Sequence, residues 1–356
     1  MSVNKIYEHA FRIAKEKRRR ITLRTARMGP ILILTLVIII SILVMPIYAK
    51  KITDCNKIQN TINSLPSTGG KVTIKAGTYN CKEPIVIDRD NVDLRGMGYA
   101  TVLRLANDAN SPVLLLGNTT EIPIVSRSNI HISDIVIDGN RENQNQSYEC
   151  WTGPCDTGGF TAIRNNGITL RNVSDVTIER VTVKKSRSGG LVSEKHNQRI
   201  NVHDFTSLDN QFDGLAAYNT QNSIFSNLYL YDNLAAGLSF DISFNNNIVN
   251  NVVITGSRKV GVFMRDSKDN FLHGFQIRNS IEHGVFLAQN SDITKPASGN
   301  TFSGFIVSNS GGAGFRVNDL SNINNLVIGS QFIGNSDGCI SEAASGLIQS
   351  YGIVCR

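Results

Sequence analysis

The chain has 356 residues and a formal net charge of +7. The excess positive charge is confined to one end, because the first 30 residues hold nine of the 36 basic residues and only two of the 29 acidic ones. The remainder is formally neutral. The basic isoelectric point therefore gives no support for a nucleic-acid-binding protein, and we expect no nucleic acid partner.

An uncharged apolar run, ILILTLVIIISILVMPIYA, occupies residues 31–49. It is long enough to cross a bilayer as a helix. Because basic residues precede it, we expect residues 1–30 to form a basic cytoplasmic stem beside anionic lipid, and residues 50–356 to lie outside the cytoplasm. The alternative is a signal peptide cleaved before Lys50, which would leave a secreted domain. A leader of that length would be long, so we favour a transmembrane anchor with the lipid bilayer as a partner.

Six cysteines outside the apolar run fall into three neighbouring couples. A zinc site is the rival interpretation, but the chain has no CxxC spacing to support one. The ends of a stacked fold are exposed edges, where cross-links would protect the chain. Proximity in the sequence favours these disulfides: Cys55–Cys81, Cys150–Cys155 and Cys339–Cys355.

A glycine followed by alternating apolar residues recurs about every 24 residues in the second half of the chain. The steps between these glycines are 23, 24, 23, 24, 23, 30 and 24 residues. A fixed period in the twenties is typical of a stacked solenoid. The apolar residues are mostly Ile, Val and Phe in alternation, which favours strands over a leucine-rich horseshoe. The repeat glycines are Gly167, Gly190, Gly214, Gly237, Gly261, Gly284, Gly314 and Gly338.

This repeat predicts an all-β fold: one single-stranded right-handed parallel β-helix. Crossovers between parallel strands are right-handed, which sets the hand of the coil. Strand patterns near 72–74, 85–94, 102–105 and 130–137 add coils before the first repeat glycine. A second column of residues supports the stacking, because asparagine tolerates tight turns and its side chain can hydrogen-bond from coil to coil. The column comprises Asn222, Asn246, Asn270, Asn300 and Asn324.

The start of the predicted solenoid carries a recognisable pattern. Between Asp54 and Gly98 the chain has an IQ…I segment, the run GGKVTIKAGTY, a strand pair and a G-x-G turn. With NIHISDIVIDGNREN at 129–143, it resembles the pectate-lyase-like superfamily of β-helix proteins over roughly residues 54–340. The resemblance implies a short N-terminal capping helix. That superfamily includes lyases, hydrolases, epimerases, phage tailspikes and non-catalytic surface proteins, so the fold does not select a reaction.

The strands also predict a polar strip on the outside of the solenoid. The first and third residues after each repeat glycine are mostly apolar and must face the lumen, so the second and fourth face outward. At a strand spacing of about 4.8 Å, five polar residues at the fourth position would form a strip roughly 20 Å long. Small residues at the second position, such as Val192, Ala216 and Ser239, would leave open space before it. The strip comprises Arg171, Glu194, Tyr218, Asp241 and Arg265.

Three further residues are candidates for substrate binding. Lys195 and His196 extend the strand end that carries Glu194. Trp151 lies between two close cysteines in the insertion ECWTGPC, where a short disulfide would stiffen an aromatic platform for a sugar ring. The alternative for Trp151 is packing against the flank of the solenoid.

The strip suits proton abstraction at C5 of a uronate in an extracellular polysaccharide. Arg265 or Arg171 would pair with the substrate carboxylate, and Tyr218 or His196 would act as acid or base. Elimination would make the protein a lyase, and reprotonation from the other face would make it a C5-epimerase. We expect no cofactor or metal, since no aspartate cluster matches the calcium site of typical pectate lyases, and calcium stays open as the alternative.

Two alternatives stay open. Glu194 and Asp241, two coils and about 9–10 Å apart, could serve an inverting glycoside hydrolase. A non-catalytic glycan- or protein-binding surface module would need only an ion-pair ladder. The chain lacks the DPHD or DPHE cluster of mannuronan C5-epimerases and the NxD, DD, GHG and RIK set of polygalacturonases, so no catalytic residue is carried over from either family.

Overall fold

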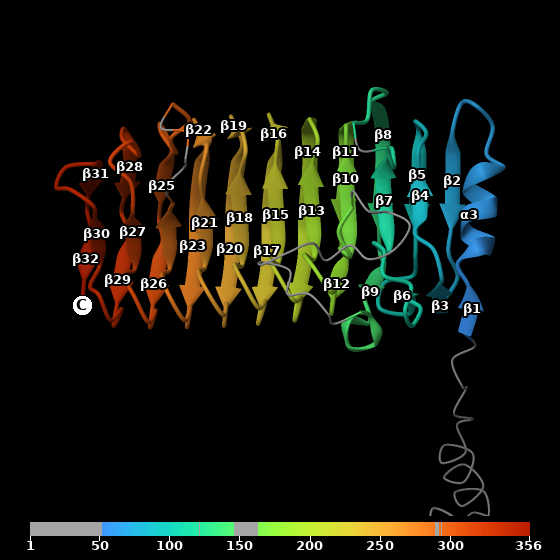
Figure 1. The fold of residues 1–356 in the computed structure, drawn as a ribbon, viewed down its shortest axis with the longest axis horizontal. Helices are drawn as coiled ribbons and strands as arrows, with labels where there is room; N and C mark the ends of the chain where they lie inside the picture. The colour runs from blue at the N-terminus through green and yellow to red at the C-terminus, as the bar shows by residue number, and fades with distance from the viewer. Residues whose placement is uncertain (1–51, 121, 146–162, 289–291, 293) are drawn as a thin grey trace, which may run out of the picture. The chain divides into compact units, whose positions relative to one another are not determined.

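The repeat glycines lead into one face of a parallel solenoid. The computed structural model describes residues 52–120, 122–145, 163–288, 292 and 294–356, which all belong to the unit Lys51–Arg356. Their coils stack along one axis, with the chain progressing from one end to the other (Figure 1). The right-handed parallel β-helix predicted from the repeat is confirmed for this unit.

Ten strands form the sheet that follows the repeat glycines. Every pairing in it is parallel and joins the same position of successive coils. At Gly190, for example, a Cβ would meet the Ser207 hydroxyl at 2.1 Å, so close packing between coils requires glycine. The strands are β4 (Ile85–Ile87), β7 (Leu114–Gly117), β10 (Ile168–Arg171), β13 (Leu191–Glu194), β15 (Leu215–Tyr218), β18 (Leu238–Asp241), β21 (Val262–Met264), β24 (Val285–Leu287), β27 (Phe315–Val317) and β30 (Ile340–Glu342).

The other faces of the coil form a second sheet of 22 strands. Long strands such as β14 pair with two strands of a neighbouring coil and so continue round a corner. The strands are β1 (Ile52–Asp54), β2 (Gly70–Thr73), β3 (Gly77–Cys81), β5 (Val92–Arg95), β6 (Thr101–Leu105), β8 (Arg127–Ser133), β9 (Val136–Asp138), β11 (Val173–Glu179), β12 (Thr182–Lys184), β14 (Asn197–Leu208), β16 (Thr220–Gln221), β17 (Ile224–Tyr231), β19 (Phe244–Asn245), β20 (Ile248–Thr255), β22 (Ser267–Lys268), β23 (Phe271–Arg278), β25 (Thr301–Ser303), β26 (Ile306–Ser308), β28 (Asn325–Ile328), β29 (Gln331–Ile333), β31 (Ile348–Tyr351) and β32 (Val354–Cys355).

The lumen of the coils is the hydrophobic core. The first residue of each strand from β10 to β27 in the ten-stranded sheet is fully buried, and so is the third. Phenylalanine rings stack along the axis, with centroids 4.1 Å apart for Phe240 and Phe244 and 4.4 Å apart for Phe275 and Phe305. The predicted period-two pattern is therefore confirmed, because alternate side chains of a strand point to one face.

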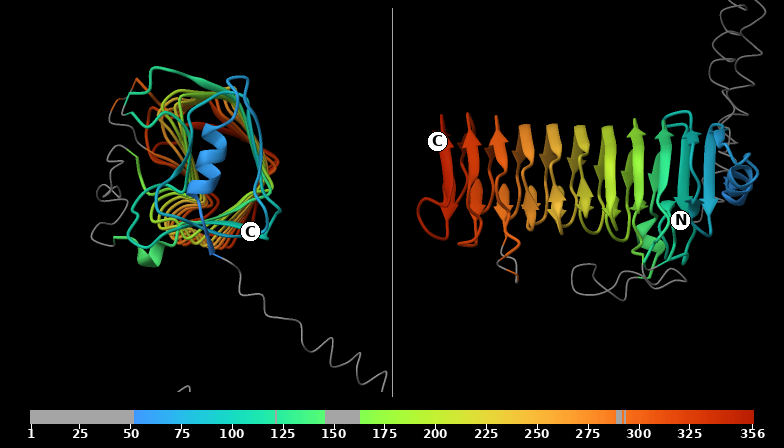
Figure 2. Two further views of the ribbon diagram at one scale, coloured as in Figure 1. Left: turned by 90° about the vertical axis from the view of Figure 1, so that its right-hand side faces the viewer. Right: turned by 90° about the horizontal axis from the view of Figure 1, so that it is seen from above.

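Both ends of the solenoid are protected. Helix α3 (Asn56–Asn63) lies across the N-terminal end and buries Ile58 and Ile62, as the resemblance implied (Figure 2, left). A short 3₁₀ helix, η2 (Arg141–Asn143), follows β9. The predicted disulfides Cys55–Cys81 and Cys339–Cys355 are formed, one in the first coil and one in the last. The predicted Cys150–Cys155 pair lies outside the described residues.

The asparagine column predicted from the sequence mixes two neighbouring positions of the coil. Asn222, Asn246 and Asn324 have left-handed backbone, with φ of 51°, 58° and 59°, and form the turn itself. The buried ladder runs through Asn247, Asn270, Asn300 and Asn325, in which each amide donates to the next side-chain oxygen at 2.8–3.1 Å. The 24-residue spacing mixed the two columns, because asparagine suits a left-handed turn and also the position after it.

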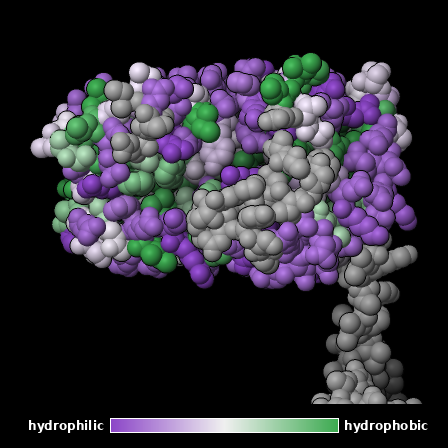
Figure 3. All heavy atoms as spheres, in the orientation of Figure 1, coloured by the Kyte–Doolittle hydropathy of each residue, from purple (hydrophilic) through white to green (hydrophobic). Residues whose placement is uncertain are grey.

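The face of the protein seen in Figure 3 is mostly hydrophilic, with apolar residues in separate patches. Among the described residues no helix is long and apolar enough to cross a bilayer. The apolar run at 31–49 lies outside them, so the membrane anchor stays a prediction.

Candidate functional site

The strip predicted from the sequence forms one column at the ends of strands in the ten-stranded sheet. Arg171 is in register with Glu194, and Tyr218 is in register with Asp241. Arg265 directly follows β21, whose last residue pairs with Phe240 of the neighbouring coil. The two halves of the column have different environments.

The Arg171 half is an ion pair between a buried arginine and a partly exposed glutamate. The Arg171 side chain is fully buried, its Nε lies 3.1 Å from Oε1 of Glu194, and its Nη1 donates to the Thr119 carbonyl at 3.3 Å. Burial raises the pKa of Glu194, while the charge of Arg171 acts against that shift. The Arg171 guanidinium is buried and already paired with Glu194, so we do not assign the binding of a substrate carboxylate to Arg171.

The second strand positions were expected to leave open space before the strip. Thr169 and Ala216 are instead at most 1% exposed, and Val192 and Ser239 are 6% and 5% exposed. These side chains point away from the lumen, yet they are covered. Strand alternation determines the direction of a side chain, but only tertiary packing determines whether solvent reaches it.

The other half of the strip surrounds a pocket of about 230 Å³. Tyr218, Asp241 and Arg265 all line it, so the structure brings together three of the five residues of the strip. Glu194 is not among the lining residues. The remaining lining residues come from the turns before each strand and from the sheet: Phe212, Asp213, Ala235, Ala236, Ser239, Lys259, Val260 and Phe263.

Asp241 and Arg265 form a close ion pair at the pocket. Nε of Arg265 donates to both carboxylate oxygens of Asp241, at 3.1 and 2.9 Å, and its Nη2 donates to Oδ2. Hydrogen bonding to Asp241 raises the pKa of Arg265. The guanidinium carbon also lies 5.6 Å from the ring centroid of Phe263. These contacts hold the arginine in place at the pocket wall.

Asp213 is the most unusual group in the pocket. Asp213 is 3% exposed, and one of its carboxylate oxygens accepts a hydrogen bond from the backbone N–H of Ala236 at 2.9 Å. Burial raises its pKa to about 7, against the opposing effects of that N–H, the Ser239 hydroxyl, Arg164 and the Tyr218 hydroxyl. Near neutral pH this carboxyl is thus able either to take up or to release a proton.

Tyr218 is the partner of Asp213. Burial raises the pKa of the Tyr218 phenol above its usual value, and the nearby Asp213 raises it further. The phenol is therefore neutral at physiological pH and carries a proton that it can donate. A buried acid and a phenol side by side form a pair suited to proton transfer.

Cationic side chains flank this pair. The Arg164 guanidinium lies 5.8 Å from the ring centroid of Phe212, and its charge favours the ionised forms of Asp213 and Tyr218. Lys259 lines the same pocket. Together with Arg265, these residues place three positive charges near Asp213 and Tyr218. The Asp213 carboxyl is only partly ionised at pH 7.

The predicted binding residues lie elsewhere. Lys195 and His196 have φ of 64° and 66°, so the chain turns left-handedly there and neither residue lines the pocket. Trp151 lies outside the described residues.

Five residues of the site were not predicted from the sequence: Asp213, Arg164, Lys259, Phe212 and Phe263. Asp213 directly precedes a repeat glycine. In the next two coils that position holds Ala236 and Val260, but in other coils it holds Asn166, His283 and Asp337, so the sequence alone does not single out Asp213.

A family model described as periplasmic copper-binding protein (NosD) matches residues 133–351. The chain is 27% identical over 234 residues to the mannuronan C5-epimerase AlgE2 of Azotobacter vinelandii, an alignment that covers 63% of this chain and 22% of that protein. It therefore spans less than a quarter of the length of that relative.

Solved structures share the fold. The A-module of the Azotobacter vinelandii epimerase AlgE6 superposes with a TM-score of 0.56 at 18% identity, covering 86% of this chain and 97% of the module. Pectate lyase Pel9A superposes with a TM-score of 0.59 at 11% identity, covering 80% of this chain and 70% of the lyase. The resemblance to the pectate-lyase-like β-helix superfamily is thus confirmed at the level of the fold.

The description of the matching family names copper, and the described residues do not fit that metal. They contain no group of three or more His, Cys, Asp or Glu side chains arranged to hold a metal ion. Cys55, Cys81, Cys339 and Cys355 form disulfides and so present no thiolate, the ligand that copper(I) prefers.

Proposed function

Because the chain belongs to the NosD family of β-helix proteins, we propose that it is an extracytoplasmic enzyme that modifies a polysaccharide. The substrate in this proposal is a uronate-containing glycan, and the reaction is a C5-epimerisation or a lyase cleavage. One observation carries the proposal: Asp213, Tyr218, Asp241 and Arg265 line the same pocket.

The charges at the pocket support an anionic substrate. Removal of the C5 proton of a uronate leaves negative charge that spreads onto the carboxylate, so cations near that carboxylate stabilise the transition state. Arg265 is positioned for this role by Asp241 and Phe263. Lys259 and Arg164 add positive charge at the same place.

Asp213 and Tyr218 serve the proton transfers in this proposal. The Asp213 carboxylate takes the C5 proton, and the electrons of the C–H bond move into the substrate carboxylate. In an epimerase, a water molecule on the opposite face of the sugar gives a proton to C5, and the resulting hydroxide takes the proton back from Asp213. Tyr218 holds Asp213 in position through the contact between the two side chains.

In a lyase the same intermediate follows another course. The bond between C4 and the glycosidic oxygen breaks, a C4=C5 double bond forms, and Tyr218 protonates the departing oxygen. The hydrolase alternative needs Glu194 at the pocket. Glu194 does not line it and pairs with buried Arg171, which disfavours hydrolysis by Glu194 and Asp241.

A non-catalytic glycan-binding module is the second candidate. The observation in its favour is that both charged ends of the strip form internal ion pairs, Arg171 with Glu194 and Arg265 with Asp241. Such pairs also occur on solvated sheets without any function.

The expected location of the protein outside the cytoplasm supports an extracellular glycan as substrate. The family is described as periplasmic, and two disulfides are formed, which is typical of oxidising compartments outside the cytoplasm. We propose in addition that residues 31–49 anchor the chain in the membrane. Alkaline extraction of membranes tests this: an anchored chain stays in the pellet, and a cleaved chain does not.

The enzyme proposal is tested on the full-length chain, with disulfides intact, in a detergent without a sugar headgroup. Oligomers of mannuronate, guluronate and galacturonate are supplied with and without calcium. Absorbance near 235 nm reports unsaturated product, NMR reports exchange of the C5 proton with solvent, and an assay for new reducing ends reports hydrolysis. We expect unsaturated product or C5 exchange in the wild type.

Variants assign the chemistry to the pocket. Tyr218→Phe and Asp213→Asn should lower turnover by at least about 100-fold, the usual contribution of an acid–base group. Tyr229→Phe on the opposite sheet is the matched control and should leave turnover unchanged. Binding without turnover on every glycan would favour the second candidate, and new reducing ends without unsaturation would move the assignment to hydrolysis.

A further inference from the structure

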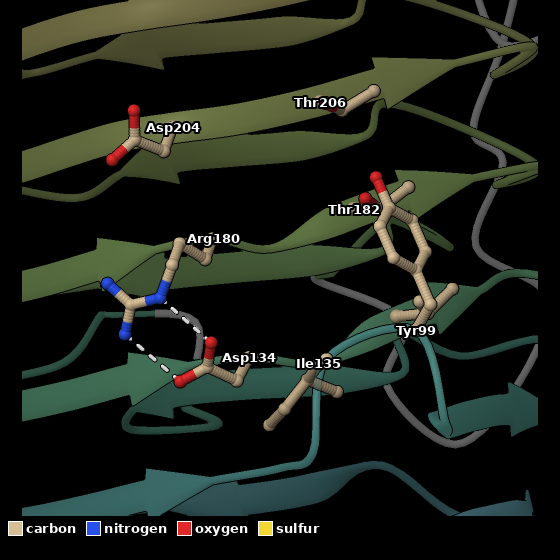
Figure 4. Close-up of a pocket in the computed structure, with 9 residues that line it drawn as sticks. Tyr99, Asp134, Ile135, Arg180, Thr182, Asp204 and Thr206 are labelled. Atoms are coloured by element: carbon tan, nitrogen blue, oxygen red, sulfur yellow. Dashed lines mark hydrogen bonds and ion pairs between the residues drawn. The ribbon is translucent and has the colours of Figure 1, made fainter.

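A second hollow lies on the 22-stranded sheet, away from the candidate active site. It is about 310 Å³ in volume. It lies at the corner of the coils, where β8 and β11 end and β14 bends. Figure 4 shows Tyr99 on one side of it and the Asp134–Arg180 pair on the other, with Thr182 and Thr206 beyond. None of its lining residues is shared with the pocket around Tyr218.

Tyr99 is exposed on a well-defined turn. Tyr99 is 78% exposed, and the neighbouring Met97 is 59% exposed. The turn is fixed by backbone bonds: Gly96 N–H donates to Ser133 at 2.9 Å, and Gly98 N–H donates to Asp134 at 2.7 Å. A Cβ at Gly96 would lie 2.3 Å from the Asp134 carbonyl, so the turn can pack there only because residue 96 is glycine.

An aromatic ring held in this way exposes apolar surface at a cost in stability. A ring on a rigid turn also loses little conformational entropy when a ligand covers it. The Tyr99 ring is therefore available to contact a ligand that has an apolar face.

The polar groups beside the ring already have hydrogen-bond or ion-pair partners. Arg180 donates two hydrogen bonds to Asp134, at 2.8 and 3.0 Å, and Arg95 lies 3.1 Å from the same carboxylate. Asp204 accepts from Asn227 at 3.0 Å. Paired charges still accept and donate hydrogen bonds to hydroxyl groups, but they do not attract a ligand of either charge.

A neighbouring hollow extends the surface along the axis. It is lined by Lys71, Thr73, Arg95 and Met97 and shares Gly98 and Asp134 with the first. Lys71 is itself paired with Asp93 at 3.6 Å. Strands β2, β5, β8, β11 and β14 pair successively, so the joined surface crosses five coils, or about 19 Å. That length suits a chain of several sugars better than a small metabolite.

We infer that this groove binds an electrically neutral oligosaccharide chain, with one sugar ring stacked on Tyr99 and its hydroxyls on Asp134, Arg180, Thr182 and Thr206. A sugar ring has an apolar C–H face and a polar rim. The apolar face matches the Tyr99 ring, and the polar rim matches the paired charges beside it. The groove is separate from the proposed active site and does not depend on the proposed reaction.

The test measures binding to the full-length chain, kept in a detergent without a sugar headgroup. Hexasaccharides of glucose, mannose, galactose and xylose are titrated by calorimetry, with hexasaccharides of mannuronate and galacturonate as charged counterparts. We expect at least one neutral hexasaccharide to bind. Tyr99→Ala should weaken that binding about tenfold, and Tyr99→Phe, which keeps the ring, should retain it within about twofold.

Two controls make the result specific. Tyr351→Ala removes a tyrosine that is 61% exposed elsewhere on the solenoid and should bind like the wild type. Tyr218→Phe should also bind like the wild type, which separates this groove from the proposed active site. The inference is overturned if no neutral hexasaccharide binds, if Tyr99→Ala binds normally, if Tyr351→Ala loses as much affinity, or if Tyr99→Ala affects only the uronate oligomers.

Discussion

Asp213 illustrates what burial does to a single acidic residue. Its carboxyl is almost without solvent and has one backbone N–H as a close donor, at 2.9 Å. Because water no longer stabilises the charge, the pKa rises to about 7, where a group can act as either acid or base near neutral pH. The same burial that suits Asp213 to proton transfer also costs stability when the group ionises.

This cost predicts a pH dependence. Asp213 titrates near pH 7 when folded and near 4 when unfolded, so the folded state binds the proton more tightly. Its stabilising contribution is complete below about pH 4 and is lost as the pH rises to about 7, at roughly 1.4 kcal/mol per unit. Asp213→Asn, whose amide oxygen still accepts the Ala236 N–H, should therefore gain stability relative to wild type over that window.

The measurement is urea unfolding of both proteins at several values from pH 4 to 9. The difference in free energy of unfolding should grow up to about pH 7 and stay constant above it. Subtracting one profile from the other removes the contribution of other carboxyls, such as Asp134, whose pKa is lowered by Arg180. Parallel profiles would mean that Asp213 ionises normally in the folded protein.

At the scale of the structural element, the turn between strands combines two roles in adjacent residues. The first residue of the pair has left-handed backbone and an exposed side chain, as at Asn246. The second is buried and continues the ladder, as at Asn270, whose amide donates to Phe244 and to Asn300 at 2.8 Å each. Its oxygen accepts from the backbone and the side chain of Asn247, at 3.0 and 3.1 Å.

Substitutions should separate the two roles. Asn270→Ala removes the acceptor for two buried N–H donors and should lower the free energy of unfolding by about 3 kcal/mol. Asn246→Gly keeps a residue that tolerates positive φ and should change it by less than about 0.5 kcal/mol. Urea denaturation followed by far-UV circular dichroism measures both. Equal effects of the two substitutions would contradict the division of roles.

At the scale of the whole molecule, the solenoid is stabilised by contacts between neighbouring coils. Each strand of the ten-stranded sheet pairs only with the strands before and after it in the stack. Effects of a change are therefore local, and the terminal coils, which have a neighbour on one side only, are the least stable. The disulfides Cys55–Cys81 and Cys339–Cys355 are in these terminal coils.

Removing the C-terminal disulfide should loosen only the last coils. The double substitution Cys339→Ser, Cys355→Ser opens a link across 16 residues, which should cost about 3 kcal/mol of local stability. Amide hydrogen exchange should accelerate in β31 and β32, while β15 and β18 in the middle of the stack exchange as in the wild type. Uniform acceleration along the solenoid would show that it unfolds as a single cooperative unit.

The sequence predicted most of the fold and part of the site. The strip placed Tyr218, Asp241 and Arg265 in one column, and the pocket contains all three. It placed Arg171 in the same column, but the arginine is buried beside the partly exposed Glu194 and lines no part of that pocket. It also joined Lys195 and His196 to the strip, although positive φ at both residues turns the chain away.

The sequence by itself determined the β-helix, its hand, the lumen-facing positions and the disulfides at its two ends. These features follow from a repeat of one coil, in which every residue contacts mainly the equivalent position of the next coil. Only the tertiary structure decided which outward residues are buried and that Asp213, from the turn before β15, meets Tyr218 at the end of that strand. That contact and the resulting pKa depend on backbone φ at the corners and on local burial, and neither is periodic in the sequence.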